Sequence, residues 1–547
     1  MRKTTLALTI GALLAATVAP AQAADLWDIY QLALKNDATF QQAQANYDAT
    51  TEDKAIARAG YLPNITLNGD REVQHSSGQV PIFFDPTTGT EKEGDASSRN
   101  YTTQYTLQLN QAIFNWAAWK AIDQADAQAA QADAQFTAAQ EDLIQRTATG
   151  YFNVLNARDT LKADRAAADA NSKQLEQAKE KYEVGMSAIT DVENAQAAYD
   201  QSAANLISAQ QQVITTEEQL RAIIGQPVGA LMEPTVDMPL RSPDPNTAQD
   251  WVTQALKQNP NLLAAQSAAD AADANIGIQR AGHYPTVSVS LTHFKNDNSQ
   301  ITPDVPAAEL GLPPNAPPIT IGQTTNLSGN TAMLNLSWPL FAGGGTWAKV
   351  NQAQAQYNAA VANVNLVNRQ TEQQARTAYL GVLTGISQVT ALKQSVKSNQ
   401  TSMDATQTGM EVGTRTIVDV LTARQNLLTA ETSFSNARYT YLESLLTLKQ
   451  AAGTLNEGDV KQLNTLLQVP VSPADMTVPA TSADMGIPSA GTVAAPSATT
   501  NPFVTTPPAG TLTPPPGAAT AKPPAGALTP PPGAATTTPP ANTPKRG

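Results

Sequence analysis

The sequence is written twice, and this duplication constrains the fold more than any other feature. Residues 33–63 (ALKNDATF…ARAGYLP) realign with residues 255–285 (ALKQNPNL…QRAGHYP) at an offset of 222 residues. Residues 184–192 (VGMSAITDV) realign with residues 412–420 (VGTRTIVDV) at an offset of 228 residues. The growth of the offset is assigned to loops, where insertions are tolerated. Each half is therefore predicted to run helix, strand, loop, strand, very long helix, turn, helix.

Each half contains a stretch that is too long for a helix of an ordinary globular domain. From about Asn115 to Tyr182 there is no proline and only one glycine, Gly150. The second half repeats this pattern from about Thr346 to Met410. About 67 residues make a rod of roughly 100 Å at 1.5 Å per residue. Such a rod cannot fold back on a compact core, so it is predicted to pack beside other rods in a coiled coil or helical tube.

Four segments alternate with the period of a β-strand. In residues 101–110, one face carries Tyr, Thr, Tyr, Leu and Leu, and the other carries only Thr, Gln and Asn. Similar patterns lie around 62–70, 287–291 and 334–340, with connecting loops expected at about 75–98 and 295–329. A strand that crosses a bilayer needs about 9–11 residues with alternating faces. A soluble sandwich with one wet face gives the same pattern, so both interpretations stay open at this point.

The strand count has a consequence for assembly. Four strands cannot close a membrane barrel, because the smallest such barrels use about eight. Open strand edges are not tolerated in lipid, where their backbone groups would have no hydrogen-bond partners. If these strands enter a membrane, several copies of the chain must close one barrel together. The sequence thus predicts a homo-oligomer.

The two ends of the chain differ from its duplicated middle. Residues 1–23 have the charged start, apolar run and Ala21-Gln22-Ala23 site of a secretory signal peptide. The chain has no cysteine, so neither disulfides nor a lipidated cysteine are expected. From about Pro470 the composition becomes rich in Pro, Ala, Thr and Gly, which predicts a disordered tail. The predicted domains are the signal (1–23), the first repeat (24–235), the second repeat (236–469) and the tail (470–547).

Nothing in the sequence indicates an enzyme or a cofactor site. His75, His283 and His293 are the only histidines, and none has a metal-ligand or triad partner at a recognisable spacing. Residues 342–346 (AGGGT) lack the lysine of a phosphate-binding loop, so they are interpreted as a strand-to-helix joint. The net charge is −13 and no Lys/Arg cluster is present, which makes nucleic acid an unexpected partner.

The turns that join the two helices of each half contain the candidate functional residues. Gly185 and Gly413 are suited to the positive φ that ends a helix, which predicts two helical hairpins. Thr416 and Asp419 fit the signature of a helix N-terminus, in which the acid reaches back to a free backbone amide. On that local interpretation Arg415 is an exposed neighbour of little energetic consequence.

The motifs of the second half identify a family. Residues 412–421 (VGTRTIVDVL), 436–442 (NARYTYL) and 451–460 (AAGTLNEGDV), with 188–200 (AITDVENAQAAYD) and 148–157 (ATGYFNVLNA), closely resemble TolC-type outer-membrane efflux proteins. The resemblance covers about 24–468. It implies an α+β membrane protein, a homotrimer whose transmembrane β-barrel takes four strands per chain and continues as a long α-helical coiled-coil tunnel across the periplasm.

The resemblance also assigns roles to residues of the turns. It implies that Asp419 forms a cation-selective ring at the pore constriction, and that Arg415 is linked to Asp191 and Thr190 to hold the gate shut. Two positions depart from the family pattern, since Met410 and Thr422 stand where well-known members have a tyrosine and a second aspartate. The tips expected to dock the adaptor are Val184, Gly185, Met186, Val412, Gly413 and Thr414.

The predicted function is that of an outer-membrane exit duct for tripartite efflux pumps or type I secretion. The implied partners are a periplasmic adaptor (membrane fusion) protein, an inner-membrane RND, ABC or MFS transporter, and outer-membrane lipid. The alternative is a secreted helical scaffold or adhesin stalk with a soluble β-head. The alternating strands and the two homologous turns favour the duct.

Overall fold

A computed structural model describes residues 23–85, 89–305, 313, 315–317 and 319–470. The predicted signal peptide and almost all of the proline-rich tail lie outside these ranges, as does part of the connection between the third and fourth long strands. Within the described ranges, no helix combines the length and the apolar character needed to cross a membrane.

The same order of elements occurs in both halves. The first half comprises α1 (Leu26–Asn36), α2 (Ala38–Ala59), β1 (Asn64–Asp85), β2 (Thr90–Phe114), α3 (Trp116–Glu183), α4 (Ile189–Ile224) and the short β3 (Met232–Pro234). The second comprises α5 (Ala248–Gln258), α6 (Pro260–Arg280), the 3₁₀ turn η1 (Ala281–His283), β4 (Thr286–Val305), β5 (Ile319–Ser337), α7 (Gly345–Glu411), α8 (Ile417–Ala451), α9 (Glu457–Asn464) and β6 (Leu467–Pro470).

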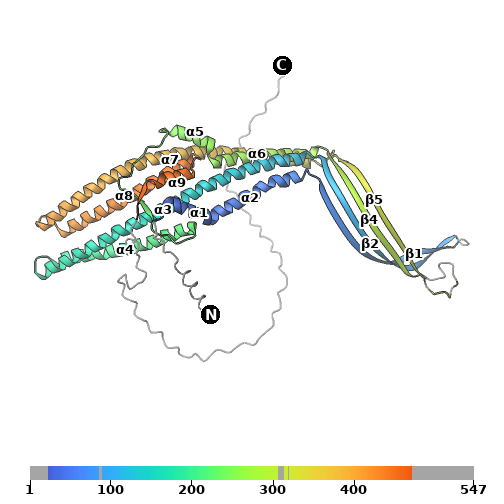
Figure 1. Cartoon of the computed structure of the whole chain (residues 1–547), viewed down its shortest axis with the longest axis horizontal. Helices are drawn as coiled ribbons and strands as arrows, with labels where there is room; N and C mark the ends of the chain where they lie inside the picture. Colours follow the sequence, from blue (N-terminus) through green and yellow to red (C-terminus); the bar gives the residue numbers. More distant parts are fainter. Residues whose placement is uncertain (1–22, 86–88, 306–312, 314, 318, 471–547) are drawn as a thin grey trace, which may run out of the picture. The chain divides into compact units, whose positions relative to one another are not determined.

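The two predicted long helices are confirmed, with 68 residues in α3 and 67 in α7. The side chain of Asn115 caps α3 by accepting from the backbone N–H of Ala118 at 3.2 Å. α2 packs on α3, α3 on α6, and α6 on α7. The sheet has the corresponding order β1-β2-β4-β5, because each strand continues directly into or out of one of these helices. Helices and strands therefore form one layer of four side-by-side elements (Figure 1).

The strands are longer than predicted. They run for 22, 25, 20 and 19 residues in β1, β2, β4 and β5 instead of about ten. Most of the two expected loops at 75–98 and 295–329 is therefore strand, and His75 pairs with Arg99 in the β1–β2 ladder instead of lying in a loop. The sequence pattern fades there because Ser, Gly and charged residues replace the apolar face, while the backbone pairing of antiparallel neighbours continues.

The register confirms the alternation where the pattern is strong. Ile65 pairs with Leu109, which pairs with Leu291 on the next strand, so apolar side chains of three strands form one row. Large apolar side chains of this sheet are exposed in the single chain, for example Leu67 at 73% and Leu334 at 70%. Among the residues that the structure describes, β1 and β5 each have a neighbour on one side only.

The main core lies where the shorter helices surround the long ones. Its largest fully buried side chains include Tyr151, Phe152 and Leu155 of α3 with Tyr439 and Tyr441 of α8. Two of these tyrosines hold the connection between the halves. Tyr151 Oη accepts from the backbone N–H of Met232 at 2.9 Å and donates to its carbonyl at 2.7 Å. Tyr441 Oη forms the equivalent pair of bonds with the backbone of Arg241, at 2.8 and 3.0 Å.

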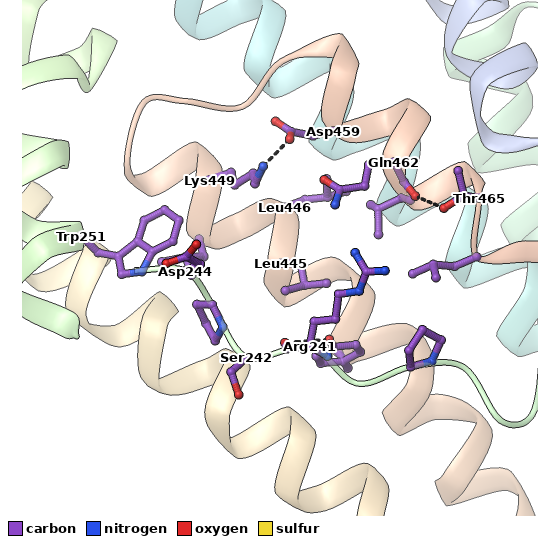
Figure 2. Close-up of a pocket in the computed structure, with 16 residues that line it drawn as sticks. Arg241, Ser242, Asp244, Trp251, Leu445, Leu446, Lys449, Asp459, Gln462 and Thr465 are labelled. Carbon is purple, nitrogen blue, oxygen red and sulfur yellow. Dashed lines mark hydrogen bonds and ion pairs between the residues drawn. The ribbon is translucent and has the colours of Figure 1, made fainter. Parts of the chain in front are cut away.

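The connection between the halves also borders a cavity of about 390 Å³ (Figure 2). Arg241 and Ser242 of the connection line it together with Leu445 and Leu446 of α8. The indole of Trp251, which donates to the carbonyl of Pro245 at 2.7 Å, lines it as well. Residues of α5, α8 and α9 thus line one cavity.

Equivalent junctions close each half. Gly225 ends α4 with φ +71° beside Asn36, and Gly453 follows α8 with φ +70° beside Gln258. Asn36 Nδ2 donates to the carbonyl of Ile224 at 2.7 Å. In the second half the donor to the α8 terminus is Asn259, whose Nδ2 reaches the carbonyl of Ala451 at 3.1 Å.

The caps of α2 and α6 at these junctions differ in charge. Asp37 caps α2 through the N–H of Phe40 at 2.6 Å and receives Arg146 of α3 at 3.0 and 3.1 Å. Burial alone would raise the pKa of Asp37, but the hydrogen bonds from Arg146 and Phe40 bring this pKa below its usual value. Asn259 occupies the same position in the second half and caps α6 as a neutral residue, accepting from the N–H groups of Asn261 and Leu262.

Candidate functional site

The two helical hairpins end in exposed turns of the same construction. Gly185 and Gly413 have φ of +75° and +81°, as predicted for both turns. The N–H of Met186 donates to the carbonyl of Lys181 at 2.7 Å, and the N–H of Thr414 donates to that of Gly409 at 2.8 Å. The apolar side chains at the tips are largely exposed in the described part of the single chain, at 70% for Val184, 77% for Met186 and 70% for Val412. This leaves both tips accessible to another protein.

The predicted cap at the start of α8 is present. Thr416 Oγ1 accepts from the backbone N–H of Asp419 at 3.2 Å, and the Asp419 carboxylate accepts from the N–H and hydroxyl of Thr416 at 2.9 and 3.0 Å. The hydrogen bonds from the backbone and hydroxyl of Thr416, with a smaller contribution from the charge of Arg415, lower the pKa of Asp419. The carboxylate is therefore held ionised and in a fixed orientation at the first turn of α8.

The same position in the first half has a different local arrangement. α4 begins after Ala188, which supplies no side-chain cap. Asp191 instead accepts from the hydroxyl of Ser187 at 2.7 Å. Thr190 lies beside it at the N-terminus of α4 and is exposed.

A cavity of about 270 Å³ is lined by residues of both hairpins, next to their tips. Arg415, Asp191 and Met410 all line it, so the fold gathers three of the sequence-predicted gate positions. Within the described part of one chain, Arg415 and Asp191 do not form an ion pair, and Thr190 does not line the cavity. The predicted Arg415–Asp191/Thr190 link remains a prediction.

Two residues near the gate were not found from the sequence. Gln174 of α3 donates through Nε2 to the sulfur of Met410 at 3.9 Å, a weak hydrogen bond in the place of the hydroxyl that methionine lacks. Gly409 lies under the stem of Arg415, since a Cβ built there would be 2.8 Å from Arg415 Cγ. Gln174 lies in the other half of the chain and belongs to no motif. Gly409 lies four positions before the tip glycine, and its sequence context indicates an ordinary helix interior.

The three histidines are not gathered into a site. His75 and His293 lie on β1 and β4, and His283 lies in η1. His293 Nδ1 is 2.7 Å from Asn330 Oδ1 on the paired strand. Among the residues that the structure describes, no cluster of three or more His, Cys, Asp or Glu side chains has the geometry of a metal site.

Comparison with known proteins agrees with this architecture. The model of the family "outer membrane efflux protein" matches residues 29–226 and 251–454, one stretch in each half. Outer membrane protein TolC of Escherichia coli (strain K12) is 33% identical over 470 residues, which cover 86% of this chain and 90% of that protein. Proteases secretion protein PrtF of Dickeya chrysanthemi is 27% identical over 472 residues, which cover 86% and 96%.

A solved structure has the same fold. The outer membrane protein VceC of Vibrio cholerae matches with a TM-score of 0.61 at 20% identity, over 78% of this chain and 96% of VceC. The family match covers well over half of the chain, and its boundaries follow the helix–strand–strand–helix order of each half. The chain belongs to the outer membrane efflux protein family.

Proposed function

We propose that this protein is an outer-membrane exit duct that three copies of the chain build together. It passes substrates of inner-membrane transporters across the periplasm and the outer membrane, for efflux and for type I secretion. It acts as a channel and not as an enzyme, in keeping with its family. The relatives named above include a protease secretion protein, which supports proteins as well as small molecules among the substrates.

The open sheet is the observation that carries the proposal. β1 and β5 have free edges in one chain, and the strand side chains Ile65, Leu107 and Leu336 are exposed at 65%, 46% and 64%. Exposed apolar side chains are unfavourable in water but suit contact with lipid, whereas free strand edges leave backbone groups without hydrogen-bond partners in lipid. Pairing β5 of one copy with β1 of the next would satisfy the edges, and three copies would supply twelve strands around one transmembrane β-barrel.

The helices extend this arrangement into a tunnel. α2 and α7 lie at the two edges of the helical layer, just as β1 and β5, to which they connect, lie at the two edges of the sheet. The same rotation that closes the strands would bring α7 of one copy beside α2 of the next. The hairpin tips would then converge at the far end, where Asp419 from three chains forms the constriction and Arg415, linked to Asp191 and Thr190, holds it closed.

The tips are the proposed contact with the rest of the pump. Their exposed apolar side chains flank glycines with positive φ, a shape that fits the end of another helical hairpin. The proposed partner there is the periplasmic adaptor that recruits the RND, ABC or MFS transporter. Replacing Gly185 and Gly413 with bulky or charged residues is expected to abolish pump recruitment while the duct still assembles.

Assembly and conductance test the proposal. The protein should fractionate with the outer membrane, migrate as a detergent-stable trimer that heat dissociates, and conduct ions in planar bilayers. A soluble monomer would instead support the scaffold or adhesin stalk and would contradict the duct.

Two variants then test the gate. Arg415→Ala should raise conductance, and Asp419→Ala should reduce cation selectivity. Asp200→Ala, which removes an exposed carboxylate of α4 away from the tips, serves as the control. Unchanged conductance in Arg415→Ala would refute the link, and unchanged selectivity in Asp419→Ala would refute the ring.

A further inference from the structure

The seam between the first hairpin and α8 is incompletely filled. α8 contacts both α3 and α4, yet three cavities of about 270, 310 and 380 Å³ follow one another along this seam from the tips upward. Asn, Gln, Ser and Thr make up half of the residues that line the middle cavity and most of those that line the upper one. A close-packed apolar interface locks two helices in one position. A seam with cavities and short polar side chains allows α8 to occupy more than one position against α3.

The middle cavity contains one positive and one negative side chain. Arg424 of α8 and Asp164 of α3 are the only charged residues among those that line it. Arg424 Nη1 donates to Asn171 Oδ1 at 3.4 Å, a long contact with a neutral group. Within the described residues, Arg424 and Asp164 do not form an ion pair with each other. Two oppositely charged side chains thus line the same cavity without forming an ion pair with each other.

Both side chains are partly removed from water. Desolvation lowers the pKa of Arg424 and raises the pKa of Asp164. Each charged form is therefore disfavoured where it stands, because no opposite charge compensates the loss of hydration. A position of α8 that brought the two together would compensate part of this loss for both groups at once.

We propose that Arg424 is a further gate residue, which contacts Asn171 in the closed seam and pairs with Asp164 when α8 shifts against α3. Asp164 and Asn171 are seven residues apart and so lie two turns apart on the same face of α3, about 10 Å along the helix. A long arginine side chain and a slide of about one turn cover this distance. This inference rests on the proposed function, because it assigns Arg424 to the opening of that duct.

The test is single-channel recording in planar bilayers, made in the Arg415→Ala background so that openings are frequent. Arg424→Gln and Asp164→Asn should each lower the ratio of open to closed time by roughly threefold to tenfold, equivalent to ~0.7–1.4 kcal/mol. The double variant should be no worse than either single one, because both remove the same pair. The exchange Asp164→Arg with Arg424→Asp should restore the ratio.

Control variants keep the result interpretable. Arg221→Gln removes an exposed arginine of α4 that pairs with Glu218, and it should leave the ratio unchanged. Asn171→Ala removes only the long contact and should not lower opening. A heat-dissociable trimer on a gel verifies assembly of each variant.

Several outcomes would overturn the inference. They are unchanged or increased opening in both single variants, additive losses in the double variant, or loss of opening with Asn171→Ala. Failure of the proposed function has a different signature, since it would show no conductance in any variant. Normal conductance with an effect of Arg415→Ala, but none of the Arg424 and Asp164 variants, refutes the inference alone.

Discussion

Gly453→Ala is expected to destabilise the second half by displacing the α5–α6 junction from the C-terminal end of α8. An alanine there must adopt φ near +70°, which costs about 1–2 kcal/mol. Its Cβ would also lie 2.6 Å from the Cα of Asn259 and against the carbonyl of Gln258, both backbone atoms. The α5–α6 junction must therefore move by on the order of 1 Å to reach ordinary contact. That movement strains the bond from Asn259 to Ala451, worth about 0.5–1.5 kcal/mol.

The matched control is Gly225→Ala in the first half. Its φ of +71° imposes the same backbone cost, but the nearest atom to its Cβ is Asn36 Cβ at 3.0 Å, so a shift of only a few tenths of an ångström relieves the contact. The difference between the variants should reach about 2–3 kcal/mol, with strain at a fixed backbone as the larger part. Unfolding in guanidinium, followed by circular dichroism at 222 nm in detergent, should place the midpoint of Gly453→Ala below that of Gly225→Ala. Equal midpoints, or the reverse order, would refute the reasoning.

Three further predictions follow from the described contacts. Tyr151→Phe should lower the unfolding free energy by about 1–3 kcal/mol, because it removes the two hydrogen bonds that the hydroxyl makes with the N–H and the carbonyl of Met232; Tyr182→Phe, at an exposed position, should change nothing by the same unfolding measurement. Gly409→Ala should displace Arg415 and raise conductance in the same direction as Arg415→Ala, whereas Gly381→Ala, whose Cβ meets open space, should not. Burial raises the pKa of Glu141 to about 8, so its carboxyl keeps a proton in the folded chain that it loses on unfolding above about pH 4.5. The contribution of Glu141 to stability should therefore fall as pH rises from about 4.5 to about 8, and Glu141→Gln should make unfolding midpoints less dependent on pH across that range. Burial also raises the pKa of Glu233 and of Glu443 to about 7, so part of the slope should remain.

The long helices and the turns between them could be predicted because their signals are local. Absence of proline over more than 60 residues and the glycines at 185 and 413 are visible without a structure, and the capping box at Thr416 and Asp419 follows from two residues at fixed spacing. The strand ends could not be predicted, since past about residue 70 the ladder is maintained by pairing with a neighbour and not by side-chain alternation.

The surroundings of the gate depend on contacts that no spacing reveals. Gln174 reaches Met410, and Arg424 reaches Asn171, from opposite halves of the chain. Neither pair belongs to a motif, and Arg424 in the sequence is one more charged residue on a mostly polar helix. Only the packing of α8 against the first hairpin shows that it is partly desolvated and faces Asp164.

Because the helix caps at the two junctions differ in charge, the two halves of the chain are expected to differ in stability at low pH. The cap at Asp37 includes an ion pair with Arg146. Its contribution to the stability of the fold is present above about pH 4 and is lost as the pH falls through the lowered pKa of that carboxyl. The cap at Asn259 consists of amide hydrogen bonds and has no charge that acid could neutralise. Acidification would therefore loosen one half of each chain before the other. In the proposed trimer, the acid-sensitive caps at Asp37 and the neutral caps at Asn259 would alternate around the ring. Acid would then weaken every second junction, so the two repeats of each chain would no longer contribute equally to the stability of the tunnel.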